Sequence, residues 1–213
     1  MIFHDVEQNT DAWLALRVGR ITSSNLSKLM AHEGKAFGEP AKQYAVNICI
    51  ERAIGRPVGG GFSNSHMERG HEQEGLARAL YEAETFSTVS NGGFFELDDI
   101  GCSPDGLVYD DGEVEIKSVI PAIHFANIKR QTIDPVYKWQ IIGNVHFTQR
   151  DWIDSISYCA DFPPDKQLYR CRVYREKTQD EFKRLMARID EFRKLIDKTA
   201  KVIDSSQYTV EAA

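Results

Sequence analysis

Apolar residues recur at the spacing of an α-helix in several stretches of the chain. In residues 177–204 they form one stripe on an otherwise charged segment, which predicts a long amphipathic helix. Shorter helices are predicted where capping residues precede a similar pattern or where a glycine ends it. These shorter helices are expected at residues 9–19, 22–31, 41–55, 65–84 and 134–148.

Short apolar and β-branched runs separated by turn residues predict strands between and after these helices. In the first four runs the dividing turns are Asn-Gly, Pro-Asp-Gly and Asp-Asp-Gly, which favours an antiparallel meander. Helices before and after the strands indicate an α/β fold, with a mixed central β-sheet flanked by helices. The strands are expected at residues 85–90, 92–97, 101–109, 112–119, 151–160 and 167–175.

Length and composition limit the number of domains and the location of the protein. A chain of 213 residues that is 42% hydrophobic can bury one substantial core, so residues 1–213 are expected to form a single domain. No stretch reaches the roughly 18 to 20 apolar residues that a membrane span needs, and the first residues lack the pattern of a secretory signal. A cytoplasmic protein with no membrane partner is therefore expected.

The four cysteines argue against two kinds of metal centre. Cys49, Cys102, Cys159 and Cys171 are scattered, without a Cys-x-x-Cys pair or a histidine cluster beside them. Zinc sites and iron–sulfur clusters usually show such local spacing. Reduced thiols in or near the core are expected instead.

The formal net charge of −6 and the pI near 5.6 argue, taken alone, against binding to nucleic acid. Net charge averages over the whole surface, however. A metal-dependent nuclease needs a cluster of carboxylates, which lowers the pI while a local positive channel binds DNA. The objection that net charge raises against nucleic-acid binding is therefore weakened but not removed.

The stretch SPDGLVYDDGEVEIK, residues 103–117, combines Asp105 with Glu115 and Lys117. Alternate side chains of a strand share a face, so Glu115 and Lys117 point the same way, and a hairpin can bring Asp105 next to Glu115. Two facing carboxylates suit a hard cation such as Mg²⁺ or Mn²⁺. The alternative is a surface hairpin in which Glu115 and Lys117 form an exposed ion pair of little energetic value.

SPDGLV followed by EIK resembles the PD-(D/E)xK nuclease signature, in particular its form in the phage lambda-type alkaline exonucleases of viral recombination systems. The resemblance extends from about residue 8 to residue 147. It implies a restriction-endonuclease-like core in which Asp105, Glu115 and the main-chain carbonyl of Ile116 bind metal. Two Mg²⁺ ions are expected, for which Mn²⁺ can substitute, and Lys117 is expected to orient and deprotonate the attacking water.

Two further carboxylate and amide positions follow from the resemblance. The family has a glutamate in a Gly-x-x-x-Glu setting on a helix before the sheet, matched here by Glu74. It also has a glutamine directed inward after the catalytic strand, matched by Gln140 in YKWQIIG. Both are expected in the catalytic site, with Glu74 reaching the metal directly or through water. In the surrounding helix, Leu76, Leu80 and Ala83 are expected on the apolar side.

The segment WLALRVGRITSSNLSKLM is similar to the family's Trp-x-x-Leu-Arg-x-Gly-x-Ile-Thr-x-Ser segment. The resemblance implies that Arg17 and Ser24, with Thr22 nearby, bind the 5′-terminal phosphate of DNA. A guanidinium and hydroxyl groups beside a helix N-terminus form a suitable anion site. Thr22 or Ser23 can also cap the following helix.

Met67 lies seven residues before Glu74, where the family has an apolar side chain that wedges between the strands at the duplex end. Insertion of such a side chain costs only a few kcal/mol per unstacked step. The chain departs from the family pattern at Ile123, where an arginine contacts DNA in the family. His124 and Lys129 are the candidates to replace that arginine.

The resemblance implies a Mg²⁺-dependent 5′-to-3′ exonuclease. It would act on linear double-stranded DNA with a 5′-phosphate, release 5′ mononucleotides and leave 3′ single-stranded DNA for recombination by strand annealing. Family members form a homotrimer ring and work with a single-strand annealing protein. A protein encoded by a bacterium, phage or prophage and acting in the bacterial cytoplasm is expected.

Two alternatives remain at this point. One is another nuclease of the same superfamily, such as a repair, restriction or structure-specific endonuclease. The other is a non-catalytic protein that binds DNA ends and whose carboxylates hold no metal. The complete set of Asp105, Glu115 and Lys117 argues against the second.

Overall fold

The computed structural model describes residues 1–58 and 65–204, apart from the side chains of residues 65–72 and 204. Its helices are α1 (Asp11–Arg17), α2 (Leu26–Met30), α3 (Glu39–Ile54), α4 (Ser65–Thr85), α5 (Pro121–Arg130), α6 (Lys138–Phe147) and α7 (Gln179–Asp204), with 3₁₀ turns η1 (Ser23–Asn25), η2 (Pro164–Lys166) and η3 (Arg175–Thr178). Its strands are β1 (Ile2–His4), β2 (Ile21–Thr22), β3 (Val89–Asn91), β4 (Phe94–Leu97), β5 (Ile100–Cys102), β6 (Gly106–Val108), β7 (Gly112–Ser118), β8 (Trp152–Tyr158) and β9 (Leu168–Tyr174).

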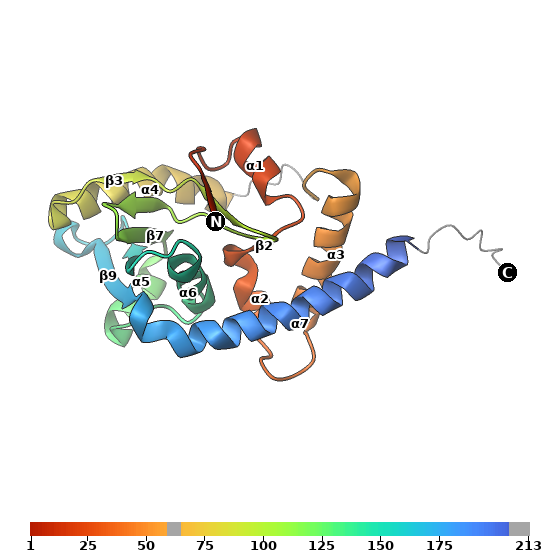
Figure 1. Ribbon diagram of the computed structural model, residues 1–213. Helices are drawn as coiled ribbons and strands as arrows, with labels where there is room; N and C mark the ends of the chain where they lie inside the picture. Colours follow the sequence, from red (N-terminus) through yellow and green to blue (C-terminus); the bar gives the residue numbers. More distant parts are fainter. Residues whose placement is uncertain (59–64, 205–213) are drawn as a thin grey trace.

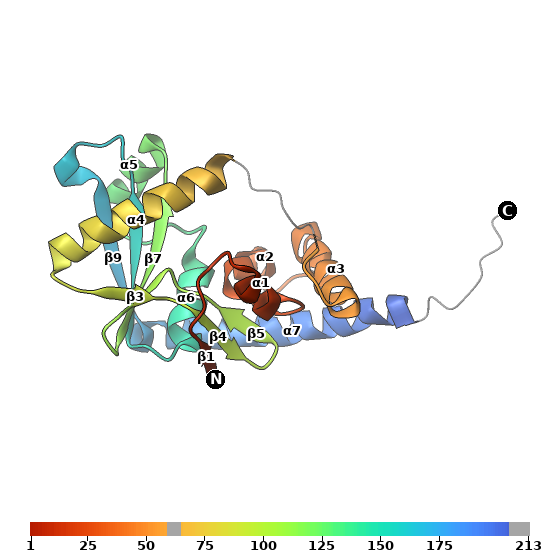
Figure 2. The same cartoon turned by 90° about the horizontal axis from the view of Figure 1, so that it is seen from above.

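The larger sheet has five strands in the order β3-β6-β7-β8-β9. Strands β7 and β8 are parallel and are connected through α5 and α6, while the other neighbouring pairs are antiparallel. Helices α4 and α6 lie on opposite faces of this sheet (Figures 1 and 2). The predicted α/β fold with a mixed sheet flanked by helices is confirmed.

A second sheet, in the order β1-β4-β5-β2, corrects the prediction of one continuous meander. Strand β3 pairs with β6 rather than with β4, and the β4–β5 hairpin between them in the chain belongs to the smaller sheet. The Asn-Gly-Gly turn cannot close a hairpin here because it passes the chain from one sheet to the other. At this crossing a Cβ on Gly92 would lie 1.7 Å from the carbonyl oxygen of Pro104, so only glycine fits.

The helices agree with the sequence pattern except at two places. Helix α3 ends at Gly55, which adopts the left-handed conformation with φ of +66°, as its pattern predicts. Helix α5 was not predicted, although Pro121 occupies its first turn. In α4 the predicted apolar side is wrong, because Leu76 is 59% exposed and the helix instead buries Ala77 and Tyr81.

Tyr81 fixes α4 to the sheet through a buried acid. Its hydroxyl donates to Asp154 on β8 at 2.8 Å, and the Arg172 guanidinium on β9 donates two bonds of 2.8 Å to the same carboxylate. Asp154 is fully buried, so this network compensates a charge that would otherwise be costly. The network explains why Tyr81 and not Leu76 faces the sheet.

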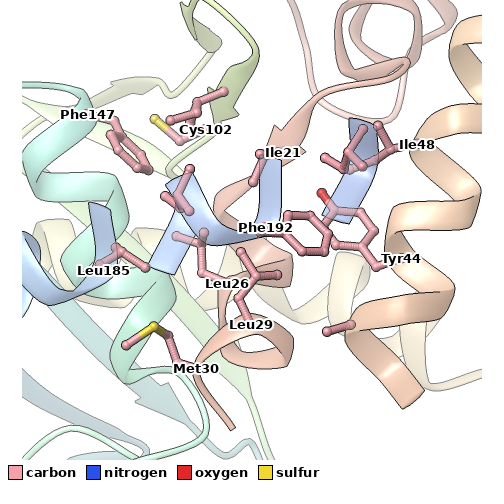
Figure 3. Close-up of a cluster of buried hydrophobic side chains, with 14 of the residues drawn as sticks. Ile21, Leu26, Leu29, Met30, Tyr44, Ile48, Cys102, Phe147, Leu185 and Phe192 are labelled. Atoms are coloured by element: carbon pink, nitrogen blue, oxygen red, sulfur yellow. The ribbon is translucent and has the colours of Figure 1, made fainter. Parts of the chain in front are cut away.

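The main core lies where α7 crosses α3, α2 and α6 (Figure 1). Leu185, Ile189 and Phe192 of α7 are fully buried, as the amphipathic stripe predicts. Phe192 stacks on Tyr44 of α3 with ring centroids 5.6 Å apart, and Figure 3 shows both rings within this cluster of buried side chains. Although α7 has 26 residues, no helix within the described ranges is long and apolar enough to cross a membrane.

We predict that Phe192→Ala lowers the free energy of unfolding by about 3–5 kcal/mol, because it removes a fully buried ring and leaves a cavity. Urea denaturation measures the change. Leu76→Ala is the matched control, since this exposed side chain contributes little to the core. Equal losses in the two variants would contradict the described packing of α7.

Candidate active site

The alternation of side chains along β7 separates an apolar face from an ionisable one. Val114 and Ile116 pack against Ala77 and Tyr81 in the core beneath α4. Glu115 lies on the opposite face and contacts Gln140 of α6. The polar residues that interrupt this apolar strand therefore all face one helix.

Glu115 is the centre of this polar face. Its side chain is only 1% exposed, and it accepts hydrogen bonds from Lys117 Nζ and Gln140 Nε2, both at 2.5 Å. A third bond comes from Asn144 Nδ2 at 2.8 Å. Burial, followed by the negative charge of Asp105, raises the pKa of Glu115 to about 8. The site thus contains more negative charge than its one lysine compensates.

Lys117 carries the positive charge of the site. Its burial disfavours the ammonium, but the nearby Glu115 and Asp105 carboxylates outweigh this effect and raise the pKa of Lys117. The ammonium also lies 5.3 Å from the ring centroid of Tyr137, within the range of a cation–π contact. Lys117 is therefore charged and directed toward the carboxylates.

Asp105 continues the register of the β6–β7 hairpin, in which Gly106 lies opposite Val114. The Asp105 amide donates to the carbonyl of Val114 at 3.0 Å, and Oδ2 accepts from the Ile116 amide at 2.6 Å. This brings the Asp105 carboxylate beside Glu115, as the hairpin spacing predicts. The two carboxylates come together where Asp105 directly precedes strand β6.

Glu74 and Arg78 place α4 beside Asp105. Arg78 Nη2 donates to the carbonyl oxygen of Asp105 at 2.6 Å and lies 3.8 Å from Glu74 Oε1. A cleft of about 560 Å³ opens here, a volume within the usual range of small-ligand sites. Besides these three residues the cleft is lined by Asp5, Glu7, Gln8, Asn9 and Asn91.

The donor set fits a hard divalent cation. Within the described ranges no group of three or more His, Cys, Asp or Glu side chains forms a complete metal site. Mg²⁺, however, normally takes only one or two carboxylates and completes its shell with water and substrate phosphate. Burial and the neighbouring Asp105 carboxylate both disfavour the charged form of Glu115, and a bound cation would favour that form. Asp105, Glu115 and the Ile116 carbonyl are the groups that would hold the ion.

Arg17 and Thr22 line a second, smaller pocket of about 110 Å³, whose lining also includes Arg20, Tyr44 and Glu51. Arg17 Nη2 lies 3.3 Å from Ser24 Oγ, which is 3.5 Å from Thr22 Oγ1. Tyr44 supports this turn, because its hydroxyl accepts from the Thr22 amide at 2.8 Å. The helix that follows, α2, has only five residues, so its dipole adds less than the sequence suggests.

Arg17 is the main cationic group of this pocket. Its guanidinium lies 4.1 Å from the ring centroid of Trp13, and burial lowers the pKa of Arg17. The same indole donates to Ser103 Oγ at 2.8 Å, two residues before Asp105. A partly desolvated guanidinium attracts an anion more strongly than a hydrated one. The pocket therefore suits a phosphate and is tied directly to the carboxylate turn.

Three further residues, Met67, His124 and Lys129, are predicted from the sequence to contact DNA. Met67 lies in α4, but its side chain is outside the described part of the molecule, so its role as a wedge stays a prediction. His124 cannot contact DNA in place of the family arginine, because it is fully buried and both ring nitrogens are bonded. Lys129 is exposed and remains available, whereas Ile123 is 42% exposed.

Sequence reasoning missed Asn144, the fully buried amide that binds Glu115. The sequence pattern could have indicated it, because Gln140 and Asn144 are two amide side chains four residues apart in a mostly apolar helix and therefore share one face. Trp13 and Tyr44 were also missed as supports of the pocket around Arg17. Nothing local distinguishes these two aromatic residues from ordinary core residues.

Comparison with known proteins bears on the family and the fold of the chain. The family model described as YqaJ-like viral recombinase domain matches residues 12–151. An alkaline exonuclease, LHK-Exo, from Laribacter hongkongensis superposes with a TM-score of 0.76 at 28% identity, over 92% of this chain and 98% of that one. A structure of LHK-Exo in complex with dAMP gives the same TM-score at 30% identity and the same coverage.

A phage-related exonuclease from Haemophilus somnus 129PT shares the fold, with a TM-score of 0.64 at 14% identity over 89% of this chain and 96% of that one. No curated protein sequence matches the chain significantly. The chain belongs to the YqaJ-like viral recombinase family. The predicted restriction-endonuclease-like fold and the predicted exonuclease class are confirmed by these comparisons.

Glu113 is an ionisable residue on β7 that the resemblance does not include. It is fully buried, and neither oxygen has a partner in hydrogen-bonding geometry within the described ranges. Burial raises the pKa of Glu113 to about 8, although the nearby Thr148 and Arg150 oppose the shift. The native state therefore binds a proton that the unfolded chain releases at much lower pH.

We predict that Glu113→Gln makes stability less dependent on pH. With a raised native pKa, the contribution of Glu113 to stability is present below the unfolded value near 4.5 and is lost as pH rises to about 8. The glutamine variant should therefore gain stability relative to the wild-type protein as pH increases from 5 to 9. Thermal denaturation across this range measures the difference, and parallel curves for the two proteins would contradict the described burial.

Proposed function

We propose that the protein is a Mg²⁺-dependent 5′-to-3′ exonuclease that degrades linear double-stranded DNA. It would release 5′ mononucleotides and leave 3′ single strands for recombination by strand annealing. The observation that carries this proposal is the juxtaposition of Asp105, Glu115 and Lys117 beside an open cleft. The family match and the likeness to LHK-Exo support it, including the dAMP that the neighbour binds.

Asp105, Glu115 and the Ile116 carbonyl would hold Mg²⁺, or Mn²⁺ in its place, with Glu74 reaching the ion directly or through water. When bound, the ions supply positive charge that stabilises the phosphoryl and leaving oxygens. Lys117, whose side chain is 25% exposed, would first release a proton to solvent and would then orient the attacking water and take up its proton. Gln140 holds the carboxylate of Glu115 in place.

The pocket around Arg17 would anchor the 5′-terminal phosphate of the substrate. Its cation, hydroxyl groups and small volume fit a phosphate monoester. Anchoring the end next to the carboxylate turn would place the first phosphodiester at the metal. Met67 would separate the two strands ahead of that bond.

The proposed assembly follows the lambda-type family. A homotrimer ring would enclose the DNA, and a single-strand annealing protein would receive the 3′ strand that the enzyme leaves. The proposed setting is the bacterial cytoplasm, with the protein encoded by a bacterium, phage or prophage. These proposals rest on the family resemblance alone.

We predict that end-labelled linear duplex is digested from its 5′ ends in Mg²⁺ and is stable in chelator. Lys117→Ala should reduce the rate by about 10²–10⁴-fold, the usual contribution of a proton-transferring side chain. Lys183→Ala, which changes an exposed lysine on α7, is the control. Digestion from 3′ ends, or nicking of covalently closed circles as fast as cutting of linear DNA, would overturn the proposal.

Arg17→Ala should reduce kcat/KM on 5′-phosphorylated duplex by about 10–100-fold, the loss expected for charge-assisted hydrogen bonds. The effect on a 5′-hydroxyl end should be much smaller, because the lost contact is to the phosphate. Arg175→Ala, on the distant turn η3, is the matched control. Equal losses on both kinds of end would exclude the role of Arg17 as a phosphate anchor.

A further inference from the structure

A chain of buried hydrogen bonds joins the two pockets. Ser23 lies between Thr22 and Ser24 of the phosphate pocket, but its hydroxyl points away from them and donates to Asn144 Oδ1 at 2.5 Å. Asn144 Nδ2 then donates to Glu115 Oε2 at 2.8 Å. Two hydrogen bonds therefore connect the proposed anchor turn to a carboxylate of the metal site.

The two bonds of Asn144 give its amide one orientation. Its Nδ2 donates to Glu115 Oε2, so the NH₂ group faces the carboxyl group. Its Oδ1 then faces Ser23 and needs a donor, because Asn144 is fully buried and cannot reach water. The Ser23 hydroxyl, in a residue only 3% exposed, is that donor.

Helix packing brings the two segments close enough for this contact. A Cβ on Gly143, the residue before Asn144, would lie 2.5 Å from Leu26 Cδ1 and 3.5 Å from Ser23 Cβ. Glycine at this position lets α6 approach the turn η1 and helix α2. The position of the Thr22–Ser24 turn therefore determines where Asn144 lies.

We propose that Ser23 and Asn144 are positioning residues that couple occupancy of the phosphate pocket to the geometry of Glu115. This inference rests on the proposed function, since it needs both a phosphate in one pocket and a cation in the other. A 5′-phosphate drawn to Arg17 and Ser24 would fix the turn, and the turn would hold Asn144 and Glu115 in the metal-binding arrangement. Binding of the metal ion would thereby increase the affinity for a 5′-phosphorylated end, and binding of that end would increase the affinity for the metal ion.

Coupling between two sites is reciprocal, so binding can test it without catalysis. The probe is a duplex with phosphorothioate terminal linkages, carrying either a 5′-phosphate or a 5′-hydroxyl, and its affinity is measured by fluorescence anisotropy in Ca²⁺ and in chelator. In the wild-type protein the preference for the phosphorylated end should increase by about fivefold or more when Ca²⁺ replaces chelator.

Ser23→Ala should keep the preference seen in chelator and lose this increase. Ser23→Thr, which retains the hydroxyl, should restore it. Thr199→Ala is the control, because it removes a partly buried hydroxyl on α7 that donates to the carbonyl of Leu195 at 2.8 Å and lines neither pocket. If Ser23→Ala does not fold, as judged by its melting temperature, Ser23→Cys provides a weaker donor of similar size.

If Ca²⁺ increased the preference of Ser23→Ala for the phosphorylated duplex as much as it does in the wild-type protein, the proposed coupling would be overturned. A wild-type preference that is equal in Ca²⁺ and chelator would also overturn it, while leaving the phosphate anchor in place. No wild-type preference for phosphate in either condition would overturn the anchor itself and the coupling with it. With Mg²⁺ and cleavable duplex, Ser23→Ala should lower kcat on phosphorylated ends with little change in KM, whereas Arg17→Ala should raise KM.

Discussion

The buried carboxylate of Glu115 is the constraint on which the rest of the site depends. A carboxylate removed from water costs several kcal/mol unless charge and hydrogen bonds compensate it. Lys117 supplies the charge, while Gln140 and Asn144 supply amide donors. Helix α6 must therefore lie over β7 with both amides directed inward, and the segment after β2 must provide the donor that Asn144 needs. One buried group thus determines the mutual placement of a strand, a helix and a turn.

The same charge balance explains how an acidic protein can act on a polyanion. The cleft beside Asp105 is lined by carboxylates, with Arg78 as its one basic side chain among the lining residues. A DNA phosphate would be repelled there unless a cation lay between them. Under the proposed function, the net charge of the chain would reflect the carboxylates that hold the ion rather than the affinity for DNA. The attraction for a DNA end would come from a different place, the partly desolvated guanidinium of Arg17.

Features encoded by neighbouring residues could be predicted from the sequence, and features that depend on remote contacts could not. The apolar stripe of α7 and the glycine that ends α3 are local, and both are present in the structure. The division into two sheets depends on the pairing of β3 with β6, and the turn residues of the sequence do not specify this pairing. Within the site, the hairpin spacing placed Asp105 beside Glu115, but the bond between Ser23 and Asn144 spans 121 residues and leaves no local pattern.

Helix α6 contains a costly arrangement that packing alone does not require. Buried polar networks are often no more stable than well-packed apolar residues of the same volume. Asn144 could be replaced by leucine in a helix selected only to cover a sheet, and Gly143 is an unfavourable residue for a helix interior. Glycine here allows close approach, and asparagine uses that approach to join Ser23 to Glu115. If the proposed coupling holds, this arrangement would keep the two pockets at a fixed separation, with α6 as their common support.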